Sequence, residues 1–359
     1  MSPDVSTATN TTHHSEHLAD RAAMLAMRTM MALQPKADLG PAGRAAFDEL
    51  MEKTPSAEGV TYEAATVGGV PGWWCRPAAA DVGPAILYLH GGAYVLGSAR
   101  AYRHFAGQFA SRANAPAFVT DYGLAPERPF PAAVEDAEAA YRGLASAGFS
   151  CIAVIGDSAG GGLALVMAAR DPAALRPVAV CVMSPWTDLA LAGDSVNTRA
   201  GHDPMLSRRS LEDARQLYLG QASAQDPRVS PLYGDLAGAP PVLLHVGEDE
   251  ILLDDARRYA DRSSESGSAV ELHIWQGMAH VFPANLALLE AAREALDIAG
   301  EFLRRNLAMN KVSRNSDQPQ LKAETKCPTS YSSARSLKRS ISRTLPCLPV
   351  SMPKRSTPG

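Results

Sequence analysis

Short, continuous apolar runs alternate with longer stretches of helical periodicity through the middle of this chain. Strands that are apolar along their whole length must be covered on both faces, and strands separated by helices run parallel. The expected strands are 60–67, 70–76, 85–89, 117–121, 151–155, 178–183, 242–246 and 270–275, and the expected helices are 17–33, 42–53, 101–112, 132–145, 159–169, 211–219, 254–264 and 284–307. The pattern predicts an α/β fold: a mostly parallel central sheet of about eight strands with helices on both faces.

The chain divides by composition into three expected parts. Residues 1–55 hold a disordered start and two N-terminal cap helices, and residues 56–306 hold the main α/β domain. A cap insertion at about 185–235 interrupts its rhythm of strands and helices. Residues 307–359 form a basic tail rich in Ser, Pro, Lys and Arg, which we expect to be disordered.

The charge distribution sets the tail apart from the rest of the chain. From Asn306 onward there are ten Lys/Arg and two Asp/Glu, so this end carries +8 of a formal net charge of −4, and residues 1–305 carry −12. A basic tail can bind nucleic acid or an acidic membrane surface. With almost no aromatic residues and no visible fold, a solvated tail is the favoured interpretation, and we expect neither nucleic acid nor membrane as a partner.

The five cysteines are odd in number and form no C-x-x-C pair, which argues against a disulfide framework or a thiolate zinc site. Residues 1–16 are polar and lack the basic start and apolar stretch of a signal peptide. No apolar run reaches the roughly 18 residues that a membrane span needs. The sequence therefore predicts a cytoplasmic protein.

The strongest chemical signal is Gly156–Gly161, read GDSAGG, which follows an apolar strand and opens a helix. A serine on a sharp strand-to-helix turn needs small neighbours, because its backbone is strained and the helix packs close to the strand. The turn lifts the hydroxyl of Ser158 clear of the sheet, at the positive end of the helix. Ser158 is the candidate nucleophile; a turn serine without a catalytic role is the alternative.

A second glycine-rich segment, His90–Tyr94 (HGGAY), directly follows the strand 85–89. Consecutive glycines let backbone N–H groups approach a substrate oxygen, and acyl-transfer enzymes need such donors to stabilise an oxyanion. Gly92 and Ala93, together with Ala159 after the nucleophile, are the candidate donors. The supporting residues expected in these motifs are His90, Gly91 and Asp157.

The base and its orienting acid should come from later loops at the same sheet edge. His280 follows the last predicted strand and precedes the last helix, which makes it the candidate base. The segment Gly247–Glu250 offers three carboxylates, of which Asp249 is the favoured acid and Glu248 its rival, since either could fix a histidine tautomer. The remaining carboxylates are expected to begin the next helix, where negative charge suits the helix dipole.

With these motifs the chain resembles the bacterial hormone-sensitive-lipase-like (family IV) esterases of the α/β-hydrolase superfamily. The likeness covers about residues 60–305 and rests on His90–Tyr94, Asp121–Glu127 (DYGLAPE) and Gly156–Gly161. The chain order of Ser158, Asp249 and His280 is the order of α/β-hydrolases. The resemblance also implies the oxyanion-hole assignment and a helical cap, and suggests a homodimer that pairs through the exposed edge of the last strand.

Three positions depart from the family pattern. Ala93 replaces the third glycine of the usual H-G-G-G run but still offers its N–H. Gly123 replaces the usual arginine after Asp-Tyr, which puts a structural contact in doubt. The spacing from Asp249 to Asp254 is one residue longer than in many members, which keeps Glu248 open as the acid.

The expected activity is that of a serine carboxylesterase acting on short- to medium-chain acyl esters of small molecules through an acyl-enzyme, with no metal or organic cofactor. The alternatives are a lactonase, amidase or deacetylase with the same triad, or a non-catalytic ligand-binding relative. The cap is expected to select the substrate. Its candidate pocket residues, which are also candidates for packing, are Trp186, Met205, Leu206 and Tyr218.

Overall fold

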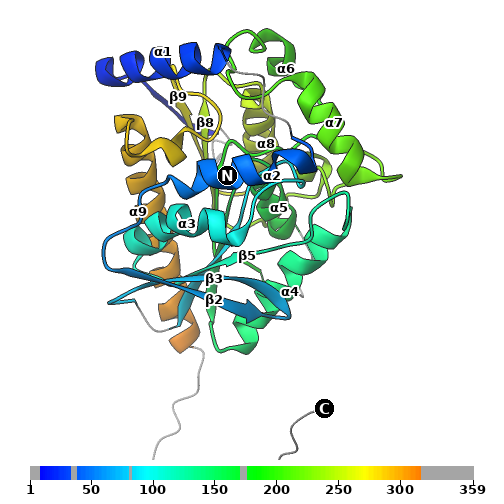
Figure 1. The fold of residues 1–359 in the computed structure, drawn as a ribbon. Coiled ribbons are helices and arrows are strands. Elements are labelled where there is room, and N and C mark those ends of the chain that lie inside the picture. The colour runs from blue at the N-terminus through cyan, green and yellow to red at the C-terminus, as the bar shows by residue number, and fades with distance from the viewer. Residues whose placement is uncertain (1–8, 34–38, 81–82, 170–175, 317–359) are drawn as a thin grey trace, which may run out of the picture. The chain divides into compact units, whose positions relative to one another are not determined.

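The computed structural model describes residues 9–33, 39–80, 83–169 and 176–316 (Figure 1). Contacts divide the chain into a unit Met1–Gln318 and a unit Pro319–Gly359, and all the described residues belong to the first. The prediction of a disordered tail therefore lies mostly outside the described residues, and the other predicted boundaries stay predictions. None of the helices in the described ranges is both long and apolar enough to cross a bilayer.

Within the described residues, nine strands form one sheet in the order β1-β9-β8-β7-β6-β4-β5-β3-β2. The strands are β1 (Asn10–His14), β2 (Val60–Val67), β3 (Val70–Pro77), β4 (Pro84–Leu89), β5 (Ala117–Thr120), β6 (Cys151–Asp157), β7 (Val180–Met183), β8 (Val242–Gly247) and β9 (Val270–Trp275). The β2–β3 hairpin and the β3–β5 pair are antiparallel, and the remaining neighbours are parallel. Since parallel strands end at the same edge, the loops after β4, β6, β8 and β9 gather there.

Helices cover both faces of this sheet, as the continuous apolar strands predict. They are α1 (Leu18–Ala32), α2 (Arg44–Glu52), α3 (Ala99–Ala113), α4 (Ala132–Ser146), α5 (Ser158–Ala168), α6 (Ser195–Thr198), α7 (Arg208–Leu219), α8 (Leu253–Glu265) and α9 (Glu290–Ser316), with 3-10 turns η1 (Pro41–Gly43), η2 (Pro231–Tyr233) and η3 (Phe282–Asn285). Alternate side chains of β4 enter different cores: Ile86 belongs to the buried cluster that includes residues of α3 and α9, and Leu87 to the cluster that includes residues of α4 and α5. The predicted α/β architecture is confirmed.

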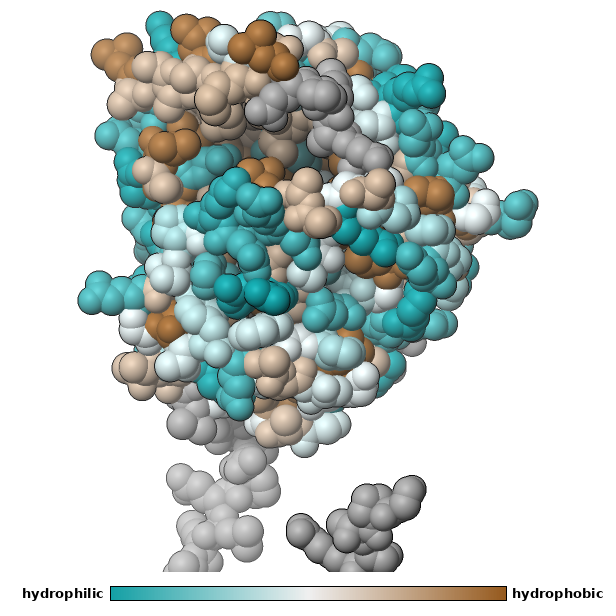
Figure 2. All heavy atoms as spheres, in the orientation of Figure 1, coloured by the Kyte–Doolittle hydropathy of each residue, from teal (hydrophilic) through white to brown (hydrophobic). Residues whose placement is uncertain are grey.

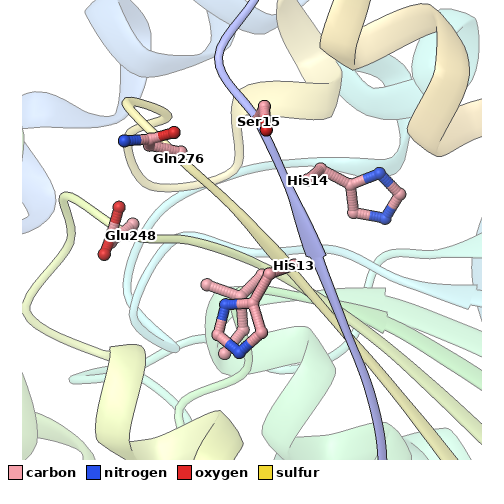
Figure 3. A pocket seen from close by; sticks show the side chains of 6 residues that line it. His13, His14, Ser15, Glu248 and Gln276 are labelled. Carbon is pink, nitrogen blue, oxygen red and sulfur yellow. The ribbon is translucent and has the colours of Figure 1, made fainter.

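A short N-terminal strand, β1, lies beside β9 in parallel register. Figure 3 shows His13 and His14 pointing to opposite sides of β1. His14 Nε2 lies 2.8 Å from His273 Nδ1, and the His14 ring stacks on Trp275 with centroids 3.7 Å apart. Residues 10–14 are therefore not disordered and β9 is not an exposed edge, so both of these predictions are wrong. The polar segment NTTHH has no apolar alternation, the signal by which a strand is recognised in sequence.

The predicted cap insertion contains α6, α7 and η2, and α1 and α6 lie near one another at the top of Figure 1. Trp186, Leu206 and Tyr218 of this insertion are buried in the main core cluster, and Met205 packs against that cluster. The Tyr218 ring stacks on Tyr94, with centroids 3.9 Å apart. The burial of these side chains agrees with the packing role that the sequence favours, and a role in lining a pocket stays a prediction.

The last helix, α9, continues to Ser316, past its predicted end at residue 307. Phe302, Leu303 and Leu307 are buried against the same core as α3. The sequence signal for this helix fades where the tail composition begins, although the helix itself does not end there.

Candidate active site

The candidate nucleophile lies where β6 ends and α5 begins. Ser158 has a φ of 52°, in the left-handed region that strains a side chain other than glycine. A Cβ at Gly156 would lie 2.2 Å from the carbonyl oxygen of Gly160, and a Cβ at Gly160 would lie 2.1 Å from that of Leu89. The turn therefore excludes any side chain at both glycines, which is the physical reason for the GDSAGG pattern.

His280 meets this serine from the loop after β9. Its Nε2 lies 2.9 Å from Ser158 Oγ, within hydrogen-bond distance. His280 is 5% exposed and Ser158 8% exposed. The structure thus brings together two residues that lie 122 positions apart in the chain, at the distance that a nucleophile and its base require.

The acid beside His280 is Glu250. Its Oε1 lies 3.1 Å from His280 Nδ1, and its Oε2 accepts hydrogen bonds from Ser184 Oγ at 2.7 Å and from the Gly247 N–H at 2.9 Å. Glu250 is fully buried. A fully satisfied carboxylate in this position can hold one tautomer of the histidine and stabilise its protonated form.

The prediction that Asp249 lies against His280, with Glu248 as its rival, is wrong. Asp249 Oδ2 lies 2.6 Å from Arg28 Nη2 in α1, which the sequence predicts as a cap helix, and Glu248 faces Arg199 at 3.7 Å. The loop after β8 thus directs Glu250 toward His280, and Glu248 and Asp249 toward arginines. One sequence signal does indicate Glu250. The spacing from Asp249 to Asp254 is one residue longer than in many family members, and Glu250 lies one residue closer to Asp254, at the usual spacing.

Ser184, which the sequence analysis missed, joins the acid to the histidine loop. It lies directly after β7 with a φ of 48° and is fully buried. Its hydroxyl donates to Glu250 and accepts the N–H of Val281, the residue after His280, at 2.9 Å. Nothing in the sequence marks this serine, because both partners lie far away along the chain.

The electrostatics of the site favour a protonatable imidazole. Burial lowers the pKa of His280, but the hydrogen bond and charge of Glu250, helped by the charges of Asp203 and Asp157, outweigh it, so the pKa lies above its ordinary value of 6.5. The imidazolium that forms during proton transfer is therefore stabilised by its surroundings.

The candidate oxyanion donors lie on the loop after β4 and at the start of α5. Gly92, Ala93 and Tyr94 have φ values of 111°, 56° and 64°. Within the described residues the N–H groups of Gly92 and Ala93 have no protein acceptor. Ala159 is the second residue of α5, and N–H groups in a first helical turn have no partner within the helix. Three backbone donors are thus free to bind a ligand oxygen.

Asp157 ties the oxyanion loop to the nucleophile turn. Its Oδ1 accepts the Gly91 N–H at 3.0 Å and the Tyr88 hydroxyl at 2.9 Å, and its Oδ2 accepts the Tyr102 hydroxyl at 3.1 Å. Burial raises the pKa of Asp157 to about 6 against the opposing effect of these donors. A Cβ at Gly91 would lie 2.2 Å from Asp157 Oδ2, so the loop needs glycine there as well.

His90 supports the same loop through its ring. Its Nδ1 lies 2.7 Å from the Gly91 carbonyl oxygen, and its ring stacks on Tyr122 at 4.4 Å between centroids. The Tyr122 hydroxyl in turn donates to the His90 carbonyl oxygen at 2.6 Å. At Gly123, which departs from the family pattern, the space beside the backbone is occupied by the Arg128 side chain. Its guanidinium carbon would lie 2.9 Å from a Cβ at that position.

Two cavities lie apart from these residues. One of about 160 Å³ lies where β1 and β9 end, beside the loop after β8, and is lined by His13, Glu248, Gln276 and their neighbours (Figure 3). Another, of about 500 Å³, lies beside Tyr233 and Arg258. Neither contains Ser158 or His280. In the part of the chain that the structure describes, no three His, Cys, Asp or Glu side chains cluster so as to hold a metal ion.

Comparison with known proteins agrees with this geometry. A family model described as the α/β hydrolase fold matches residues 86–284. The chain is 39% identical to an acetyl-hydrolase of Streptomyces hygroscopicus over 73% of this chain and 88% of that protein, and 34% identical to an esterase of Acinetobacter venetianus over 72% and 87%.

Among solved structures, the chain is similar to an esterase from the bacterial hormone-sensitive lipase family. The two are 37% identical, with a TM-score of 0.76 over 81% of this chain and 99% of that one. An esterase/lipase from an uncultured bacterium is also 37% identical, with a TM-score of 0.73 over 79% and 98%. The chain therefore belongs to the hormone-sensitive-lipase-like esterases of the α/β-hydrolase fold, a family of carboxylic ester hydrolases.

Proposed function

We propose that this carboxylic ester hydrolase cleaves short- to medium-chain acyl esters of small molecules through a triad of Ser158, His280 and Glu250. The observation that carries the proposal is the position of His280, whose two ring nitrogens lie 2.9 Å from Ser158 Oγ and 3.1 Å from Glu250 Oε1. A buried histidine between a hydroxyl and a carboxylate is the arrangement that activates a serine.

In the proposed first step, His280 Nε2 takes the proton of Ser158 as its oxygen attacks the ester carbonyl. The N–H groups of Gly92, Ala93 and Ala159 receive the negative charge on the carbonyl oxygen. Glu250 stabilises the imidazolium. His280 then returns the proton to the leaving alcohol, which leaves an acyl group on Ser158.

In the second step, water takes the place of the alcohol. His280 removes its proton as the water oxygen attacks the acyl carbonyl, and the collapse of the second tetrahedral intermediate returns the proton to Ser158 and releases the carboxylic acid. The proposed steps use only side chains and backbone groups of this chain.

Two observations support a small acyl group. A relative 39% identical to this chain is named an acetyl-hydrolase. The buried rings of Trp186 and Tyr218 lie 6.3 Å and 3.9 Å, between centroids, from that of Tyr94 on the oxyanion loop, and bulky rings packed there would leave little room for a long acyl chain. A cytoplasmic location and a homodimer stay predictions.

The test is hydrolysis of p-nitrophenyl esters from acetate to palmitate by the intact protein and by Ser158→Ala. We expect a preference for the short esters and a loss of about 10⁶-fold in kcat in Ser158→Ala. Ser266→Ala, which alters an exposed hydroxyl bonded to the Arg262 carbonyl at the end of α8, is the matched control and should behave as the parent.

Retention of ester hydrolysis by Ser158→Ala would disprove the proposed nucleophile. If the intact protein cleaves no ester but cleaves lactones or amides in a Ser158-dependent way, the triad proposal stands and the substrate class changes. Turnover of none of these would favour a ligand-binding relative.

A further inference from the structure

Asp249 lies next to the triad acid without touching His280, and it has basic partners of its own. Its Oδ2 lies 2.6 Å from Arg28 Nη2, and its Oδ1 faces Arg199 Nη1 at 3.7 Å and His202 Nδ1 at 3.9 Å. The Asp249 side chain is only 19% exposed. A half-buried carboxylate among such groups is held more firmly than an exposed surface ion pair.

Arg28 joins three separate segments of the chain through one guanidinium. Besides Asp249, it donates from Nη2 to the Gly277 carbonyl oxygen at 3.1 Å and from Nη1 to the His202 carbonyl oxygen at 2.6 Å. Gly277 lies on the loop that carries His280, and His202 lies in the cap insertion. The planar fork of an arginine suits such a multiple contact, which a lysine cannot reproduce.

The helix that carries Arg28 packs on the protein along one narrow face. Only Asp20 and Met24 of α1 are buried, and Asp20 accepts the N–H groups of Glu290 and Ala291 at the start of α9. Leu25 and Met30 are 66% and 62% exposed, and Figure 2 shows an apolar surface along the top of the molecule, where Figure 1 places α1. After Met24, Met27 packs against the cluster that contains Trp275 and Met278, and Arg28 supplies the hydrogen bonds and ion pair to the triad loops.

A shift of Asp249 would also reach the catalytic loops through the backbone. The Asp249 N–H donates to the Met278 carbonyl oxygen at 3.0 Å, and Glu250 is the next residue. The acid loop and the histidine loop are thus bonded through Asp249, which Arg28 also contacts, and through Met278, the residue after Gly277. A misplacement of about 1 Å in such a site can cost roughly 10²-fold in rate.

From these contacts we propose that Arg28 and Asp249 are positioning residues, through which docking of the cap helix α1 holds Glu250 in line with His280. The proposal rests on the proposed triad. It assigns to the cap a second role besides substrate selection, since a cap that is not docked leaves the acid misplaced.

The experiment compares Arg28→Ala, Asp249→Asn and the double variant by kcat, KM and the pH dependence of kcat/KM on p-nitrophenyl butyrate. Arg112→Ala is the matched control: Arg112 is 22% exposed against 25% for Arg28, and it pairs with Asp297 at 2.7 Å between α3 and α9, away from the triad. We expect each single variant to lose roughly 10–100-fold in kcat, and the double variant to lose no more than the worse single one.

The pH profile gives a readout that a loss of folded protein cannot imitate, because the midpoint of its acid limb does not depend on enzyme concentration. The carboxylates whose charges raise the pKa of His280 are Glu250, Asp203 and Asp157. Arg28→Ala and Asp249→Asn change the local charge in opposite senses. If Glu250 is misplaced in both, the acid limb moves to lower pH in both.

Opposite movements of the acid limb in the two variants would overturn the proposal. They would show that the charges of Arg28 and Asp249 act directly on the pKa of His280, without a displacement of Glu250. A rise in KM with kcat and the acid limb unchanged would overturn it too, because it would reduce the pair to cap docking. So would a kcat equal to that of Arg112→Ala. Hydrolysis that persists in Ser158→Ala refutes the proposed function. If hydrolysis depends on Ser158 but Arg28→Ala and Asp249→Asn have no effect, only this inference is refuted.

Discussion

The nucleophile side of the site depends mainly on glycines and backbone groups, whereas the acid side depends mainly on side chains of distant segments. Around Ser158 and the oxyanion loop, glycines stand where any Cβ would collide with backbone or with a buried carboxylate. Around Glu250, the partners are Ser184, His280 and the Gly247 N–H. Steric exclusion leaves a mark in the sequence next to the residue it serves, while a side-chain partner far along the chain leaves none.

The largest effect on catalysis is expected from a substitution of Glu250 on the acid side. Glu250→Gln keeps the shape but removes the charge that stabilises the imidazolium, so kcat should fall about 10³–10⁴-fold with little change in KM. Glu248→Gln is the control, because Glu248 faces Arg199 at 3.7 Å and not His280. Ester kinetics on both variants measure this, and a Glu250→Gln variant within tenfold of the parent would remove Glu250 from the mechanism.

On the nucleophile side, we expect a loss of stability from a steric clash. Gly160→Ala places a Cβ 2.1 Å from the Leu89 carbonyl oxygen, so the turn must shift, at a cost of about 1–3 kcal/mol in the free energy of unfolding. Gly201→Ala, where a Cβ would meet nothing within 4 Å, is the matched control. Urea unfolding compares the two, and equal stabilities would show that close packing does not set the GDSAGG pattern.

The acid side also contains a buried carboxylate whose titration should affect stability without affecting catalysis directly. Burial, with the nearby charge of Asp188, raises the pKa of Asp255 to about 8 from 3.8, against donors that include the N–H groups of Thr187 and Asp188. The folded state therefore keeps a proton that the unfolded state loses. This contribution to stability is complete below about pH 4 and is lost as the pH rises toward 8.

Asp255→Asn should remove that dependence. The parent minus variant difference in the free energy of unfolding should fall by up to about 1.4 kcal/mol per pH unit across this window. Asp297→Asn, at a side chain that is 70% exposed, is the control. Urea titrations at several pH values measure the difference, and a difference that does not change with pH would contradict the raised pKa of Asp255.

The same contrast explains what the sequence could predict. The sheet, the nucleophile turn and the placement of His280 follow from apolar runs and glycine spacing, which are local signals. The choice among Glu248, Asp249 and Glu250 depends on the direction in which a three-residue loop turns, and that direction is set by Arg28 and Ser184, far away in the chain. β1 was missed for a related reason: its polar residues pair with β9 through backbone and a histidine stack.

The most direct test of the central claim, that Glu250 and not Asp249 supports His280, is the pH dependence of kcat/KM for the parent, Glu250→Gln and Asp249→Asn. Glu250 raises the pKa of His280, so the parent's acid limb should lie above 6.5. It should move to lower pH in Glu250→Gln, and less far in Asp249→Asn. An acid limb that moves further in Asp249→Asn than in Glu250→Gln would contradict the assignment of Glu250.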